Sequence, residues 1–426
     1  PALIGAHAAL LDQEFVMQTK KVEVLSPVGS FESLQAAIRG GADAIYFGVE
    51  QLNMRAKSVN MLTVEDLAEV NRICKEHQVK NYLTLNTVMY DHDMQLVKSI
   101  IQEAQAQGTD AVIASDFAVI ELCNRLNMPL HISTQANVSN IEAVTFFSRF
   151  SDVIVLAREL TMTQIENITK EIVRRDIRGV SGEPIRIETF VHGALCMAVS
   201  GKCYMSLHEQ NASANRGACT QNCRRPYKVT DLETGNEMVV DNEYIMSPKD
   251  LCTIEILDQV INAGVDVLKI EGRGKSADYV FTTTKCYKEA VEAVAAGTFT
   301  AERAAEWMKE LETVYNRGFW EGYYLGRKLG EWTPNPGNAA TVKKVYVAKG
   351  VRYYPNARVG EFVVESGKMK KGDQIMIMGP NYGMVKIELD DFRVNGNDAE
   401  EAQKGDRVTF TIAEKISKSD KLYKLV

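Results

Sequence analysis

Short apolar runs alternate with amphipathic stretches from Val22 to about Ile270. The amphipathic stretches carry apolar residues at helical spacing, as in Leu34, Ala37 and Ile38, which predicts helices with one buried face. Eight apolar runs read as strands: Val22–Leu25, Ala44–Phe47, Tyr82–Asn86, Ala111–Ala114, Leu130–Ser133, Val153–Leu156, Ile185–Val191 and Val265–Ile270. Strand–helix alternation repeated eight times predicts an α/β fold of the (β/α)8, TIM-like barrel type. An open doubly wound sheet is less favoured, because no Gly-rich fingerprint follows the first strand.

One connection in this pattern is abnormally long. Residues 192–252, between the seventh and eighth strands, form an insertion that contains Gly, Ser, Asn and a cluster of cysteines. A long loop inside a compact domain is usually functional or disordered. The cysteines favour a functional insertion.

The pattern of apolar and polar residues changes after the predicted barrel. Residues 277–327 predict helices, and the segment Trp332–Gly337 reads as a Pro-containing linker. Beyond it, Lys371–Gly379 and Lys404–Ile412 are turn-plus-strand units with alternating polarity, which predicts a small all-β barrel. We therefore divide the chain into a leader or added segment at 1–16, a TIM-like domain at 17–333 and a C-terminal β-domain at 338–426.

Composition and charge narrow the possibilities. The 426 residues are 45% hydrophobic and 25% charged, as in ordinary globular proteins, and no stretch approaches the ~20 apolar residues of a membrane span. We therefore expect no membrane partner. Because the sequence shows no export signal, we also expect a cytoplasmic location, where cysteines stay reduced. The net charge is −7, but residues 338–426 hold 16 Lys/Arg against 12 Asp/Glu. This weakly basic tail is a modest indication of a polyanionic partner.

The most informative feature is a cluster of thiols. Five of the eight cysteines fall within 57 residues: Cys196, Cys203, Cys219, Cys223 and Cys252. Their irregular spacing suits a [4Fe–4S] cluster, which needs four thiolates, better than a zinc ribbon with its two-residue gaps, so zinc is the alternative occupant. Four ligands are needed and five candidates exist. Cys252 is expected to open a helix, where the helix dipole would favour its thiolate.

Polar residues follow most of the predicted strands, at the end where barrel enzymes build their sites. Candidate substrate-binding residues are Arg55, Asn86, Gln135, Arg158, Arg273 and Lys275, and candidate catalytic residues are Glu188, His192 and Glu271. Arginines can hold a small dicarboxylate by bidentate contacts. His192 could equally be a base, a ligand or a packed structural histidine.

Protease signatures are missing from the sequence. There is no Gly-x-Ser-x-Gly elbow, and His208–Ala212 lacks the second histidine of a zincin. Gly274-Lys-Ser276 resembles the end of a phosphate loop, but Lys269 occupies the required earlier glycine position.

Several motifs in order resemble the U32 family, the so-called collagenase-like peptidases. They are Glu188–Ser206, Asn215–Cys219, Cys223–Tyr227, Ser247–Cys252 and Leu268–Arg273. The resemblance implies an incomplete or modified (β/α)8 barrel with a C-terminal β-barrel, and cluster ligands among the five cysteines. It is strongest to the branch that hydroxylates transfer RNA, where members bear [4Fe–4S] clusters and depend on prephenate.

The resemblance thus implies prephenate-dependent hydroxylation of wobble uridine to 5-hydroxyuridine in tRNA. A U32 peptidase acting on matrix proteins or peptides is the alternative, and a non-catalytic RNA-binding or assembly factor is a weaker one. For an RNA enzyme, the β-domain and a basic set from the insertion should hold the phosphate backbone. That set is Arg216, Arg224, Arg225 and Lys228. The sequence leaves the oligomeric state open.

Overall fold

The computed structural model describes residues 21–49, 52–55, 62–227, 230–235, 246–326, 331–333, 337–390 and 392–426. The predicted leader, residues 1–16, lies outside these ranges, as does Lys228. In the described part of the chain, no helix has the length and apolarity needed to cross a membrane.

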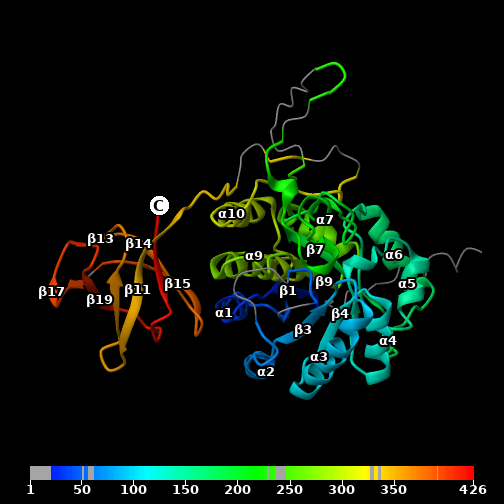
Figure 1. Ribbon diagram of the computed structural model, residues 1–426, viewed down its shortest axis with the longest axis horizontal. Coiled ribbons are helices and arrows are strands. Elements are labelled where there is room, and N and C mark those ends of the chain that lie inside the picture. Colours follow the sequence, from blue (N-terminus) through cyan, green and yellow to red (C-terminus); the bar gives the residue numbers. More distant parts are fainter. Residues whose placement is uncertain are drawn as a thin grey trace, which may run out of the picture.

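The first domain is a closed barrel of eight parallel strands (Figure 1). Successive strands pair in chain order, and β9 pairs with both β7 and β1, which closes the ring. The strands are β1 (Glu23–Pro27), β2 (Ala44–Phe47), β3 (Lys80–Leu85), β4 (Ala111–Ala114), β5 (Leu130–Ile132), β6 (Val153–Val155), β7 (Arg186–Gly193) and β9 (Val267–Ile270). The predicted barrel is confirmed, since each of these strands overlaps one of the eight predicted runs.

Helices cover the outside of the ring, and local sequence sets their ends. Ser30 caps α1 through a capping box with Ser33, and Thr161 caps α6 in the same way with Gln164. Gly108 ends α3 in the left-handed conformation, at φ +84°, where glycine has no steric penalty. The helices are α1 (Phe31–Arg39), α2 (Leu67–Glu76), α3 (Met94–Gln107), α4 (Phe117–Leu126), α5 (Ile141–Phe147), α6 (Met162–Arg174), α7 (Met205–Gln210), α8 (Leu257–Asn262), α9 (Ala277–Ala295) and α10 (Ala301–Glu312).

The ring carries a two-strand extension that the sequence did not predict. Strand β8 (Asp250–Cys252) pairs antiparallel with the end of β7, and β10 (Phe319–Trp320) pairs with β8. Cys252 therefore lies in a strand, opposite His192, and not at the start of a helix. The expectation of a helix-activated thiolate at Cys252 is wrong, because the short helix η5 (Ile254–Ile256) begins only after the strand.

The C-terminal domain is all-β, as predicted, with its own buried core around Phe362 and Phe410, whose rings stack at 5.1 Å. Its main sheet runs in the order β15-β14-β20-β11-β12-β19-β16-β17, beside the pair β13–β18. The strands are β11 (Lys344–Tyr354), β12 (Val359–Val364), β13 (Lys368–Lys370), β14 (Gln374–Gly379), β15 (Gly383–Glu388), β16 (Arg393–Val394), β17 (Asn397–Asp398), β18 (Glu401–Gln403), β19 (Arg407–Thr411) and β20 (Lys421–Leu425).

This sheet packs against α1 and α9 on the side of the barrel (Figure 1). Arg39 of α1 donates to the carbonyl oxygens of Tyr382 and Met384 at 2.9 and 3.2 Å. Gly383 lies so close to α1 that an added Cβ would sit 2.6 Å from the Ala36 nitrogen. The two domains are therefore held together by direct helix–sheet packing.

Candidate functional site

The C-terminal ends of the strands form a charged mouth centred on one ion pair. Arg55, in the loop after β2, donates to Glu271, at the end of β9, at 2.6 Å. Burial alone would raise the pKa of Glu271, but Arg55 and then Arg158 hold it at about 2. Glu271 is therefore a carboxylate at neutral pH, and the same pair raises the pKa of Arg55.

Two further arginines enter the mouth, as the strand-end reasoning predicted. Arg273 donates to Asn53 at 2.9 Å and to Thr84 at 2.7 Å. Arg158 stacks on the Phe190 ring at 3.8 Å and donates to the Ala194 carbonyl oxygen at 3.1 Å. Burial lowers the pKa of both guanidinium groups, that of Arg273 to about 10.

Glycine makes room for this arrangement. A Cβ on Gly48, directly after β2, would lie 2.8 Å from Nη1 of Arg273 and 2.6 Å from the Asn53 side chain. No larger residue fits there unless Arg273 moves away. The buried Nε of Arg158 has no hydrogen-bond partner.

A second ion pair forms the floor beneath the mouth. Lys269 of β9 and Glu188 of β7 are both buried and meet at 2.6 Å, and Lys269 Nζ lies 4.4 Å from the Tyr46 ring centroid. Burial lowers the pKa of Lys269 and raises that of Glu188, in each case against the pull of the partner charge. Glu188 Oε2 has no partner. The predicted catalytic Glu188 therefore faces the barrel interior.

His192, another predicted catalytic residue, packs among aromatic rings below the surface. Its neighbours are Tyr279, Tyr287 and Phe319, with centroids 5.3–5.9 Å away, and the Tyr287 hydroxyl lies 3.4 Å from Nδ1. Burial, followed by the charge of Lys275, lowers the pKa of His192 to about 3. This environment fits the structural interpretation of His192 and a neutral imidazole.

Four of the five candidate cysteines lie together. Burial raises the pKa of Cys223, and the adjacent Arg224 opposes this rise. The thiols of Cys196, Cys219 and Cys203 are near enough to raise the same pKa by charge repulsion. Cys252 is absent from that set. It is buried beside the Tyr287 hydroxyl at 3.8 Å, and burial raises its pKa to about 12. The structure thus separates Cys252 from the other four.

The four-thiol group adjoins the mouth. Cys196 is near enough to Arg158 to raise the pKa of that guanidinium, and Cys219 has the same effect on Arg55. Within the described ranges, no three His, Cys, Asp or Glu side chains are close enough to hold a single metal ion. Zinc would need its thiolates around one atom at about 2.3 Å, whereas a [4Fe–4S] cluster binds each thiolate at a different iron and so spreads them apart. Four thiolates are the donor set that a [4Fe–4S] cluster takes, one at each iron.

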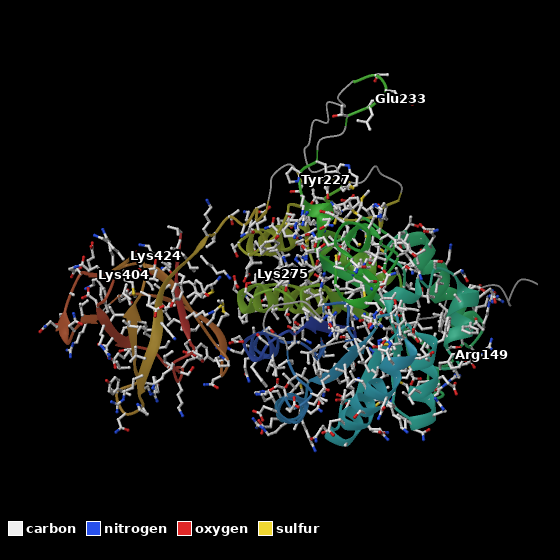
Figure 2. All side chains as sticks on the ribbon, viewed as in Figure 1. Arg149, Tyr227, Glu233, Lys275, Lys404 and Lys424 are labelled. Atoms are coloured by element: carbon white, nitrogen blue, oxygen red, sulfur yellow. The ribbon has the colours of Figure 1, made fainter. Side chains whose placement is uncertain are left out.

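The remaining predicted binding residues support the loops around the mouth. Asn86 accepts from the Met54 nitrogen at 3.2 Å and donates to Ser133 at 3.4 Å. Gln135 lies under the insertion, against Gly201, and its Oε1 is buried without a partner. Lys275, which is labelled in Figure 2, lies 3.1 Å from the Tyr315 ring centroid, and burial lowers its pKa to about 8.

The predicted RNA-binding arginines are mostly engaged within the protein. Arg224 donates to Ser247 and Pro248 at 3.0 and 2.7 Å and also to the Leu195 carbonyl oxygen. Arg216 pairs with Asp93, and Arg225 pairs with Glu209 at 2.7 Å on the surface. The structure thus places the Arg224 guanidinium against the Ser247 hydroxyl and the carbonyl groups of Pro248 and Leu195. The role of these arginines in RNA binding stays a prediction.

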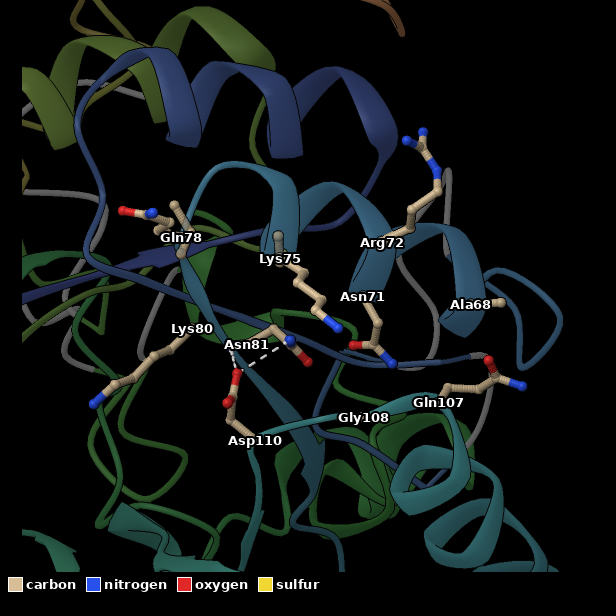
Figure 3. Close-up of a pocket in the computed structure, with 12 residues that line it drawn as sticks. Ala68, Asn71, Arg72, Lys75, Gln78, Lys80, Asn81, Gln107, Gly108 and Asp110 are labelled. Atoms are coloured by element: carbon tan, nitrogen blue, oxygen red, sulfur yellow. Dashed lines mark hydrogen bonds between the residues drawn. The ribbon is translucent and has the colours of Figure 1, made fainter.

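A hollow of about 560 Å³ lies at the opposite end of the barrel, where β3 and β4 begin (Figure 3). Asn71, Lys75, Lys80 and Asp110 line it, and Asp110 accepts hydrogen bonds from Asn81 at 2.8 and 3.2 Å. Barrel enzymes place their chemistry at the other end, so this hollow is not the candidate site.

Sequence reasoning missed three inward-facing residues of the site: Tyr46, Phe190 and Lys269. Two are aromatic and lie within apolar strands, where they resemble ordinary core. Lys269 could have been identified from the sequence. It lies inside the apolar run Val267–Ile270, and a lysine within a buried strand is itself buried.

The fold and mouth define a (β/α)8-barrel enzyme with a cationic site beside a four-thiol group. The model of peptidase family U32 matches residues 29–334. The chain belongs to this family.

Named relatives fall into two groups. A "Collagenase" of Porphyromonas gingivalis is 52% identical over 96% of this chain and 99% of its own length. The "tRNA hydroxylation protein P1" of Bacillus subtilis is 32% identical over 85% of this chain and 84% of its own. The "23S rRNA 5-hydroxycytidine C2501 synthase" of Escherichia coli is 33% identical, over 74% of this chain and 47% of its own.

Proposed function

We propose that this chain hydroxylates a pyrimidine base of RNA, converting wobble uridine of tRNA to 5-hydroxyuridine with prephenate as co-substrate. The observation that carries the proposal is the cationic mouth of Arg55, Arg158 and Arg273 directly beside four clustered thiols. Two carboxylates of a small co-substrate need two cationic groups in a partly dry pocket. The similarity to the Bacillus subtilis tRNA hydroxylation protein supports the same proposal.

In this proposal Cys196, Cys203, Cys219 and Cys223 hold a [4Fe–4S] cluster. When bound, the cluster would supply one-electron or Lewis-acid chemistry next to the mouth. Arg158 and Arg273 orient the dicarboxylate, and Glu271 is the ionised group that can accept a proton there. The reaction belongs in the cytoplasm, where thiols stay reduced and tRNA is present.

Peptide hydrolysis is the second candidate function, and the names of the relatives favour it. The relative named collagenase is more similar than the tRNA hydroxylation protein, at 52% against 32% identity. The geometry offers less support. His192 is buried and held neutral, and the thiol opposite it, Cys252, has a raised pKa, the reverse of an activated nucleophile.

One experiment separates the two functions. The gene is deleted and restored as wild type or as the Arg158→Ala variant, and tRNA nucleosides are measured by mass spectrometry. Hydroxylation predicts that 5-hydroxyuridine disappears on deletion, returns with wild type and stays absent with the variant. Unchanged nucleosides, together with gelatin cleavage by the purified chain, would establish the peptidase instead.

A further inference from the structure

Exposed apolar side chains gather on the loops at the mouth end of the barrel. Val88 and Tyr90 follow β3, Phe117 follows β4, and Met197 and Tyr204 lie in the insertion after β7. Their exposed fractions are 45, 51, 71, 45 and 70%. Such a group of exposed apolar residues around a site is typical of a surface that another molecule covers.

Tyr90 is the best-supported member of this group. The Arg216 guanidinium lies 4.1 Å from its ring centroid, and the His92 ring lies 5.7 Å away. Asp93 holds this unit together, since it pairs with Arg216 and accepts from the Tyr90 nitrogen at 2.7 Å. Tyr90 is thus a ring fixed from behind by a cation, with half of its surface open.

The unit is continuous with the mouth. The Val88 nitrogen donates to the Asn215 carbonyl oxygen at 3.1 Å, and Arg216 donates to the Val88 carbonyl oxygen at 3.0 Å. These bonds fasten the loop after β3 to the insertion that carries the cysteines. The same loop begins at Asn86, which contacts Met54 beside Arg55. A molecule lying on Tyr90 therefore lies on a loop that is joined directly to the loops of the site.

We propose that Tyr90, backed by Arg216, is a stacking platform for an unpaired RNA base that flanks the nucleotide entering the mouth. This inference rests on the proposed function. RNA-binding proteins read splayed, single-stranded bases by stacking them on Tyr, His and Arg planes. Tyr90, His92 and Arg216 are all planar groups, and the adjacent mouth holds more cations than carboxylates. These three residues do not form an aliphatic groove of the kind that would suit an apolar peptide.

The test is equilibrium binding of a short unstructured RNA to the full-length chain, measured by fluorescence anisotropy. Tyr90→Ala should weaken binding about 5- to 150-fold, the loss expected for one stacked base. Tyr90→Phe keeps the ring and should bind as wild type does. An abasic oligonucleotide with the same phosphates has nothing to stack, so it should bind both chains equally.

Phe146→Ala is the matched control. Phe146 is 41% exposed, and Arg149 lies 5.2 Å from its ring centroid, on the side of the barrel away from the C-terminal domain (Figure 2). This variant should leave RNA affinity unchanged. RNA binding that survives Tyr90→Ala would overturn the platform but not the proposed function. No RNA binding by wild type, or Tyr90-dependent binding of a Pro-rich peptide in its place, would overturn both.

Discussion

Arg55 and Glu271 are 216 residues apart in sequence and form a 2.6 Å ion pair at the mouth of the barrel. Arg55 follows β2 and Glu271 follows β9, so the pair spans the strands flanking β1 and bridges the place where the ring closes. Because Glu271 already occupies the Arg55 guanidinium, Arg158 and Arg273 are the arginines left for an incoming carboxylate.

Arg55→Ala tests how much this pair contributes to stability. The change leaves Glu271 buried without its nearest cation, so the free energy of unfolding should fall by about 1–3 kcal/mol in urea denaturation. The double variant Arg55→Ala/Glu271→Gln removes the stranded charge and should recover part of the loss. Arg72→Ala, which breaks only exposed pairs with Glu69 and Glu76, should change stability far less, because solvent screens those pairs. Equal losses for the two arginines would contradict this account.

The arrangement of the thiols predicts which cysteines retain iron. After anaerobic purification, Ala variants of Cys196, Cys203, Cys219 or Cys223 should lose iron and the visible absorption band. Cys252→Ala should keep both, because Cys252 lies outside the four-thiol group. Cys286→Ala, a buried thiol of α9, is the matched control for cavity effects. Iron loss in the Cys252 variant alone would reverse the assignment.

Lys275 predicts a pH dependence of anion binding. Its pKa is lowered to about 8, chiefly by burial, so the cation is present below that pH and lost above it. Affinity for a small dicarboxylate, measured by calorimetry, should therefore fall as pH rises through about 8. Lys275→Gln should bind weakly at every pH, without this step. Lys275→Arg should keep its affinity at high pH, because a guanidinium stays charged. A wild-type step that persists in the Gln variant would assign the titration to another group.

The barrel was predictable because its signals are long and repeated. Eight apolar runs that alternate with helical stretches leave few alternatives, and Val265–Ile270 was placed within two residues of β9. The strands β8 (Asp-Leu-Cys) and β10 (Phe-Trp) were not predictable, since neither forms an apolar run of the length used to recognise the barrel strands. Cys252 was misplaced for that reason.

The site was predictable only in part. The strand-end rule found Arg55, Arg158 and Arg273, because parallel strands of one barrel bring their ends together. It could not reveal that Arg224 turns inward, since two of its three partners are backbone carbonyl groups, which every sequence offers. Nor could spacing exclude Cys252 from the thiol cluster, which depends on how the insertion folds back.

The buried pair of Glu188 and Lys269 gives the last prediction. Glu188→Gln leaves a lysine enclosed between the barrel strands without a counter-charge, which should cost about 3–5 kcal/mol of unfolding free energy. The pKa of Lys269 is already lowered by burial and should fall further without Glu188. The unfolded chain then binds more protons than the folded one, so the variant should regain stability as pH rises from 7 toward 10.

Replacing both partners distinguishes a stranded charge from lost packing. Glu188→Leu/Lys269→Met keeps a similar volume without either charge, and it should be more stable than Glu188→Gln at pH 7. Urea denaturation at pH 7 and 9.5 measures both effects. If the double variant is the less stable one, and Glu188→Gln shows no gain at high pH, then packing around Tyr46 and Phe190 stabilises this layer and the ion pair does not.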